Sequence, residues 1–145
     1  MKEIQTEIEL HSCVSTAWKI LTDFSTFHVW NPVITQIIGE ARLGEKLKIS
    51  VRTNKGKTRI YRPTITKLEE NHELRWKGKS FIPGFLNGER IFIFQQTSRD
   101  YVRLLHSELF SGFGTIIAGR RLIEDVESSL QQMNNAFKKR VEHAT

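Results

Sequence analysis

The sequence predicts an α+β fold in which one long C-terminal helix packs against an antiparallel sheet. Three observations predict it: a two-residue alternation at the N-terminus, a series of strand-like segments separated by short turns, and a helical stripe of apolar residues at the C-terminus. The chain has 145 residues, of which 39% are hydrophobic and 26% are charged. This length and balance predict one globular domain, residues 1–145, with a buried core.

The first elements are a strand and two short helices. Residues 3–11 alternate between apolar and charged side chains, which predicts a half-buried strand. Apolar residues then recur at helical spacing over residues 14–22, which predicts a short amphipathic helix. A second short helix or turn is expected over residues 23–31. It should end before Pro32, because the residue that precedes a proline is pushed out of the helical region.

The middle of the chain has a β pattern from residue 33 to residue 113. The strand candidates cover residues 34–39, 45–53, 57–69, 73–81, 89–97 and 101–111. Short connections between successive candidates predict an antiparallel meander, which gives seven strands together with the first one. Pro63 lies inside the third candidate and predicts a sheet edge or a bulge there.

The long helix follows Gly119. Its apolar stripe consists of Leu122, Val126, Leu130, Met133, Phe137 and Val141. Only the sheet is large enough to supply a groove of matching length. A sheet that curves around this helix leaves a space between them, which is either filled by side chains or open as a cavity.

The positive charge is concentrated in one part of the chain. The net charge is +6, and residues 42–79 hold twelve Lys and Arg against four Glu. An anionic partner is one interpretation, but the alternation of Lys46, Lys48 and Arg52 with apolar residues favours the solvent face of a sheet. We therefore expect no specific nucleic-acid partner. With no signal segment, no apolar run that could span a membrane, and Cys13 as the single cysteine, we expect a cytoplasmic protein.

Several short signatures occur in a characteristic order along nearly the whole chain. They are Ala17-Trp18, Leu21-Thr22-Asp23-Phe24, Trp30-Asn31-Pro32-Val33-Ile34, Leu74-Arg75-Trp76-Lys77-Gly78, Gly88-Glu89-Arg90, His106-Ser107-Glu108 and Met133-Asn134-Asn135-Ala136-Phe137-Lys138. In these features the chain resembles the START/Bet v 1-like (SRPBCC) superfamily, in particular its bacterial polyketide cyclase/dehydrase-like branch.

This resemblance implies a helix-grip fold. In such a fold a curved seven-stranded antiparallel sheet wraps around the long C-terminal helix, with two short helices after the first strand. The resemblance also implies an apolar cavity for hydrophobic ligands such as lipids, sterols or polyketide-like aromatics. Some members of the superfamily are enzymes and many only bind ligands, so the fold leaves open whether this chain is an enzyme.

His106 and Glu108 are the candidate catalytic residues. They lie two residues apart on a strand candidate, so they share a face with Leu104 and Phe110, which suggests that both point inward. A carboxylate in an apolar cavity can serve as an acid or a base near neutral pH. The alternatives are that the pair anchors a polar part of the ligand or that it stabilises the fold.

The candidate ligand-binding residues are the large side chains expected around the cavity, together with one amide. They are Trp30, Asn31, Trp76, Phe85, Leu104, Phe110, Met133 and Phe137. The tryptophans, Met133 and Phe137 form either the cavity wall or ordinary core, and Asn31 either orients a ligand or makes the turn before Pro32. Phe85 belongs to the apolar loop 81–86, which is a pocket rim, a dimer contact or plain packing.

No cofactor or metal is expected, because the histidines lack metal-ligand spacing and the glycines form no nucleotide-binding motif. The leading hypothesis is a monomer or homodimer that binds a small hydrophobic ligand between the sheet and the C-terminal helix. The alternative hypothesis is a cofactor-independent polyketide cyclase or dehydratase that uses His106 or Glu108 as its acid or base.

Overall fold

The computed structural model describes residues 2–79, 87–112, 114–117 and 119–144. Within these ranges the strands are β1 (Lys2–His11), β2 (Ile34–Ile38), β3 (Lys48–Arg52), β4 (Thr58–Tyr61), β5 (Thr64–Glu69), β6 (Glu73–Lys79), β7 (Asn87–Gln96) and β8 (Tyr101–Ser111). The helical segments are α1 (Val14–Thr22), the 3₁₀ helix η1 (Phe24–Thr26), α2 (Phe27–Trp30), α3 (Gly114–Ile117) and α4 (Arg120–His143).

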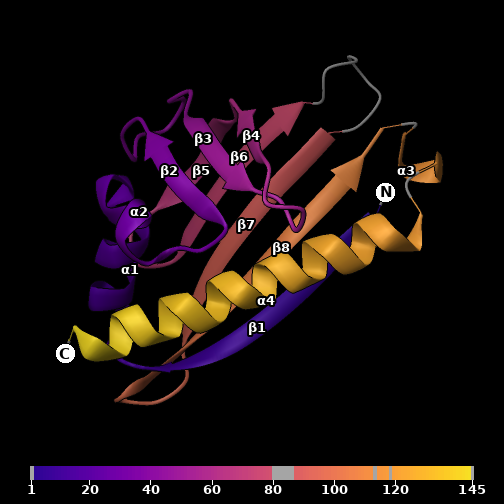
Figure 1. Ribbon diagram of the computed structural model, residues 1–145. Helices are drawn as coiled ribbons and strands as arrows, with labels where there is room; N and C mark the ends of the chain where they lie inside the picture. The colour runs from indigo at the N-terminus through magenta and orange to yellow at the C-terminus, as the bar shows by residue number, and fades with distance from the viewer. Residues whose placement is uncertain (1, 80–86, 113, 118, 145) are drawn as a thin grey trace.

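The strands form two antiparallel sheets that enclose one side of α4 (Figure 1). The larger sheet has the order β1-β8-β7-β6-β5, and the smaller one has the order β2-β3-β4. Helix α4 runs along the larger sheet and packs mainly against β1, so that the C-terminus lies beside α1. The α+β class, the short helices after the first strand and the long C-terminal helix are therefore as the sequence predicts.

The expected single sheet of seven strands is wrong, because the described strands form a sheet of five and a sheet of three. The candidate strand 57–69 divides at Pro63 into β4 and β5. Proline has no N–H for the ladder and constrains the residue before it, so the chain bends there and passes from one sheet to the other. The Pro63 carbonyl still accepts a hydrogen bond from the Leu47 N–H at 2.8 Å, and an isolated bridge joins Lys46 to Thr64.

The apolar stripe of α4 has two different environments. Leu130, Met133, Phe137 and Val141 are buried, whereas Leu122 and Val126 are half-buried. The C-terminal half of the helix thus packs into an aromatic core, in which the Phe137 ring lies 5.5 Å from that of Trp30. The N-terminal half meets a space described below. No helix in the described ranges is long and apolar enough to cross a lipid bilayer.

Candidate functional site

A cavity of about 670 Å³ lies between the smaller sheet, the adjoining ends of β6, β7 and β8, and the N-terminal half of α4. Its apolar wall is formed by Val33, Ile34, Ile49, Val51, Trp76, Phe110, Leu122 and Val126. Pockets for small-molecule ligands usually measure roughly 300–1,000 Å³ and have mainly apolar walls. Both properties suit a small hydrophobic molecule.

Two glycines on neighbouring strands line this cavity. Gly78 and Gly88 lie opposite one another on β6 and β7, and Gly88 is in turn opposite Phe110 on β8. All three residues line the cavity. A Cβ atom on Gly88 would lie 2.6 Å from Oε1 of Glu108, so even an alanine would displace that carboxylate. The absence of a side chain at Gly88 therefore leaves room for the Glu108 carboxylate.

Arg90 and Glu108 form an ion pair at the inner end of the cavity. The two residues are opposite one another on β7 and β8, and Arg90 Nε donates to Glu108 Oε2 at 2.5 Å. Arg90 Nη1 also donates to His106 Nε2 at 3.3 Å and approaches Met133 Sδ at 3.7 Å. Arg90 was not among the candidate site residues, although strand alternation places it on the same face as Phe92.

His106 is buried in a closed hydrogen-bond network beside this pair. Its Nδ1–H donates to Asn134 Oδ1 at 2.7 Å, the Asn134 amide donates to Thr6 Oγ1, and the Thr6 hydroxyl donates to the His106 carbonyl oxygen. The imidazole also stacks on the Phe92 ring at 4.4 Å. Burial and the positive charge of Arg90 hold the pKa of His106 well below its ordinary value, so the ring is neutral near pH 7.

The candidate residues fall into two groups around two spaces. Trp76, Glu108 and Phe110 line the 670 Å³ cavity. His106 lies at a second, much smaller space. This void measures about 10 Å³ and has room for about one water molecule, and four more candidates surround it. These candidates are Trp30, Leu104, Met133 and Phe137.

Asn31 belongs to the turn that leads into β2. Its Oδ1 accepts hydrogen bonds from the backbone N–H groups of Val33 and Ile34, at 2.9 and 2.8 Å. The side chain is buried and is not part of the wall of either space. Phe85 and the rest of the apolar loop 81–86 lie outside the described residues.

Three residues of metal-ligand type meet at the turn between β5 and β6. The ligand atoms of Glu69, His72 and Glu73 lie within 4.8 Å of one another. The negative charge of Glu73 is already balanced, because Arg75 and Lys67 both form ion pairs with it. The hydrogen bond from His72 is the largest of the effects that lower the pKa of Glu69. The group therefore fits an ion-pair network at the end of the sheet, away from the cavity.

Residues 1–142 match the family described as polyketide cyclase / dehydrase and lipid transport. The chain belongs to this family. The membership confirms the expected place within the SRPBCC superfamily, in its polyketide cyclase-like branch. No curated protein matches the chain by sequence.

Solved structures of other proteins share the fold of this polyketide cyclase-like chain. A START superfamily protein from Mycobacterium smegmatis is 19% identical, with a TM-score of 0.82 and 99% of both chains covered. An aromatase/cyclase from Streptomyces sp. R1128 is 11% identical, with a TM-score of 0.81, and the match covers 98% of this chain and 94% of that one. A protein from Mesorhizobium loti is 15% identical, with a TM-score of 0.76 and 99% of both chains covered. At these identities the similarity concerns the fold.

Proposed function

We propose that this protein binds a small hydrophobic ligand in the 670 Å³ cavity. The observation that carries the proposal is the cavity itself, which has mainly apolar walls and is lined by the facing residues Gly78 and Gly88. Membership of a family described by cyclisation, dehydration and lipid transport supports the same conclusion. Each Å² of apolar ligand surface that leaves water contributes about 25 cal/mol, before the costs of ordering the ligand.

A pair of adjacent serines on α4 offers a direct test. Ser129 lines the cavity and is half-buried, whereas Ser128 is exposed on the outer side of the same helix turn. We expect the indole of Ser129→Trp to occupy part of the cavity and obstruct it, and Ser128→Trp to leave it open. The probe is N-phenyl-1-naphthylamine, an uncharged molecule whose fluorescence rises in apolar surroundings.

The proposal requires saturable binding of the probe to the wild type with one site per chain. Ser129→Trp should weaken that binding at least about tenfold, while Ser128→Trp should bind as the wild type does. Circular dichroism and the melting temperature check that both variants fold. Absence of saturable binding to the wild type, or equal binding by the two folded variants, would contradict the proposal.

A second candidate function is the cyclase or dehydratase reaction without a cofactor. It is favoured by one observation, namely that Glu108 lines the cavity and so can reach a bound carbonyl compound. The contribution of His106 is restricted, because both of its ring nitrogens are hydrogen-bonded and it borders the small void instead. In this reaction Glu108 would move the proton, and Arg90 would hold the carboxylate in position.

Glu108→Gln separates this candidate from simple binding. The variant keeps the size of the side chain but cannot accept a proton as a carboxylate does. If the protein is a cyclase, turnover of a poly-β-keto thioester should fall at least about a hundredfold while the apparent affinity changes less. Unchanged turnover and unchanged affinity in Glu108→Gln would remove both the catalytic and the anchoring role of Glu108.

A further inference from the structure

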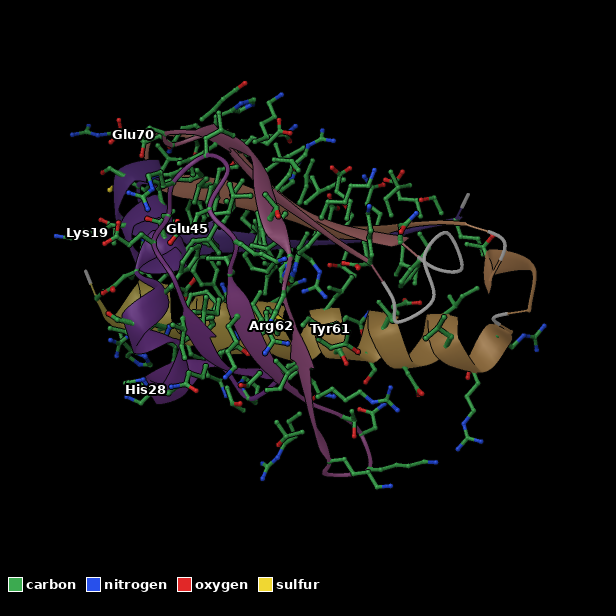
Figure 2. The ribbon with its side chains drawn as sticks, turned by 90° about the horizontal axis from the view of Figure 1, so that it is seen from above. Lys19, His28, Glu45, Tyr61, Arg62 and Glu70 are labelled. Carbon is green, nitrogen blue, oxygen red and sulfur yellow. The ribbon has the colours of Figure 1, made fainter. Side chains whose placement is uncertain are left out.

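The mouth of the cavity is lined with cations. Six exposed Lys and Arg residues belong to its wall: Arg52, Lys55, Lys57, Arg59, Lys79 and Arg121. Four of them come from β3, β4 and the turn between these strands, and Arg121 comes from the first turn of α4. Segments that are distant in sequence therefore converge on one positively charged opening. Figure 2, viewed from above, shows the strands of the smaller sheet crossing over α4.

Among the described residues, these cations have no carboxylate partners of their own. Within the described ranges, none of the six forms an ion pair at 4.0 Å or less. The acidic residues in the wall are Asp125, whose Oδ1 accepts a hydrogen bond from Asn54 at 3.1 Å, and Glu108, which is paired with Arg90. The mouth thus carries a large excess of uncompensated positive charge.

The position of Arg59 differs from that of an ordinary solvent-facing cation. Arg59 is opposite Val51 in the β3–β4 ladder, and Tyr61 is opposite Ile49. Residues that face one another across a ladder, or that lie two apart on a strand, share one face of the sheet. Since Ile49, Val51 and Tyr61 all line the cavity, Arg59 belongs to the cavity face of the hairpin.

The inner end of the cavity has a different character. There, Trp76 and Phe110 provide apolar surface, and the charge of Arg90 is already balanced by Glu108. We infer that the ligand is an anionic amphiphile, with its acidic group at the cationic mouth and its apolar part directed toward Trp76 and Phe110. This inference rests on the proposed function and specifies the ligand class of the same cavity.

Two ligands of equal tail length test the inference, namely dodecanoate and 1-dodecanol. Their dissociation constants would be measured by displacement of N-phenyl-1-naphthylamine, below the concentration at which either ligand aggregates. We expect the wild type to bind dodecanoate at least about tenfold more tightly than the alcohol. Raising NaCl from about 50 to about 500 mM should weaken dodecanoate binding severalfold and leave the alcohol nearly unaffected, because salt screens exposed charges.

Two double charge reversals then show whether the cations of the mouth cause the preference for dodecanoate. Arg59→Glu with Arg121→Glu reverses two cations of the mouth. Arg62→Glu with Arg120→Glu reverses two exposed neighbours that are not part of the cavity wall. Both double variants lower the net charge from +6 to +2, because each reversal changes it by two. Arg62 follows Tyr61 at the end of β4 in Figure 2.

The mouth variant should bind dodecanoate roughly tenfold less tightly, since two exposed ion pairs with the ligand are lost and each reversal adds repulsion. Its affinity for dodecanol, and the affinity of the control variant for both ligands, should change less than about twofold. If the mouth variant fails to fold, the single changes Arg59→Gln and Arg121→Gln replace it, each with an expected weakening of about two- to threefold.

The outcomes distinguish this inference from the proposed function. Equal affinities for the two ligands, both lost in Ser129→Trp, would overturn the anionic head group and leave a hydrophobic-ligand cavity. Failure of both ligands to displace a bound probe would overturn the inference alone, whereas absence of probe binding contradicts the proposed function.

In a further experiment, vesicles with and without phosphatidylserine are sedimented with each variant. Charge-dependent vesicle binding with unchanged dodecanoate affinity would assign the cations to a membrane surface and overturn the inference.

Discussion

His106 is held in the neutral form by its surroundings. Its Nδ1–H is committed to Asn134, its Nε2 accepts from Arg90, and the ring is completely buried. A proton on Nε2 would lose the hydrogen bond from Arg90 and face a neighbouring positive charge at a buried position. The residue therefore couples β7, β8 and α4 through two hydrogen bonds, of which the one from Arg90 requires the neutral imidazole.

The stability of the protein should consequently fall as the pH drops below about 6.5, the ordinary pKa of histidine. Above that pH neither the folded nor the unfolded state binds the proton at His106. Below it the unfolded state binds the proton and the folded state does not, so the free energy of unfolding decreases by up to about 1.4 kcal/mol per pH unit. Urea denaturation between pH 7.5 and pH 5 measures this effect.

The comparison with His106→Gln isolates this contribution from that of other titrating groups. The variant is less stable at pH 7.5, because Asn134 loses its hydrogen-bond donor, and the difference from the wild type should shrink as the pH falls. Leu104→Val is the control, since Leu104 is buried on the same face of β8 and does not titrate. A constant difference between the wild type and His106→Gln across this range would contradict a lowered pKa.

Asn31 should stabilise the fold without contributing to ligand affinity. Its Oδ1 satisfies two backbone N–H groups at the start of β2. Asn31→Ala removes this acceptor, and we expect a loss of about 1–2 kcal/mol in the free energy of unfolding. The dissociation constant of the probe should change less than about twofold. A large loss of affinity in a variant of wild-type stability would instead make Asn31 a ligand-orienting residue.

At the scale of elements, α4 divides into a half that stabilises the fold and a half that borders the cavity. Leu130 is completely buried, whereas Leu122 is half-buried and lines the cavity. Leu130→Ala should therefore cost about 2–5 kcal/mol of stability, since it leaves a cavity in packed core. Leu122→Ala should cost less than about 1.5 kcal/mol, because its surroundings are already open.

Urea denaturation of the two variants measures the contrast, provided that both unfold with the same dependence on denaturant as the wild type. Leu122→Ala should in addition alter the affinity for the probe, which Leu130→Ala should change much less. Equal losses of stability at the two positions would mean that the N-terminal half of α4 is packed as tightly as the C-terminal half.

At the scale of the whole molecule, a ligand that binds only the folded state must stabilise it. At a free ligand concentration of one hundred times the dissociation constant, the expected gain is about 2.7 kcal/mol. Thermal unfolding with dodecanoate should show this gain for the wild type and for Ser128→Trp. If Ser129→Trp binds about tenfold more weakly, its gain at the same ligand concentration should fall to about 1.4 kcal/mol or less. A similar gain in that variant would indicate binding elsewhere on the surface.

The overall fold could be predicted because it depends on long repeating patterns. The α4 stripe and the alternation in β1 extend over enough residues to be unambiguous. The division into two sheets could not be predicted, because it depends on how the chain continues on either side of Pro63 in three dimensions. The sequence also gives no measure of the volume left between facing elements, so it could not separate the packed end around Phe137 from the open end around Trp76.

The candidate site was predictable only where strand alternation applies. Alternation places His106 and Glu108 on the inner face, but it does not indicate that Arg90 links them or that Asn134 from α4 binds the imidazole. The sequence did contain a signal for Arg90. An arginine two residues from Phe92 shares the apolar face of its strand, and a buried arginine requires a partner. The cationic mouth combines a hairpin with the first turn of α4, and no local pattern joins those segments.

We expect the junction between the two sheets to set how fast a ligand can be exchanged. Backbone hydrogen bonds join residues 44–47 to residues 63–65, and in the part of the chain that the structure describes one hydrogen bond, between Asn54 and Asp125, joins the hairpin to α4. Separation of the smaller sheet breaks far fewer bonds than unfolding of the β1-β8-β7 ladders would. Amide hydrogens of β3 and β4 should therefore exchange with solvent sooner than those of β7 and β8. The residence time of a bound molecule should follow the opening rate of that smaller sheet.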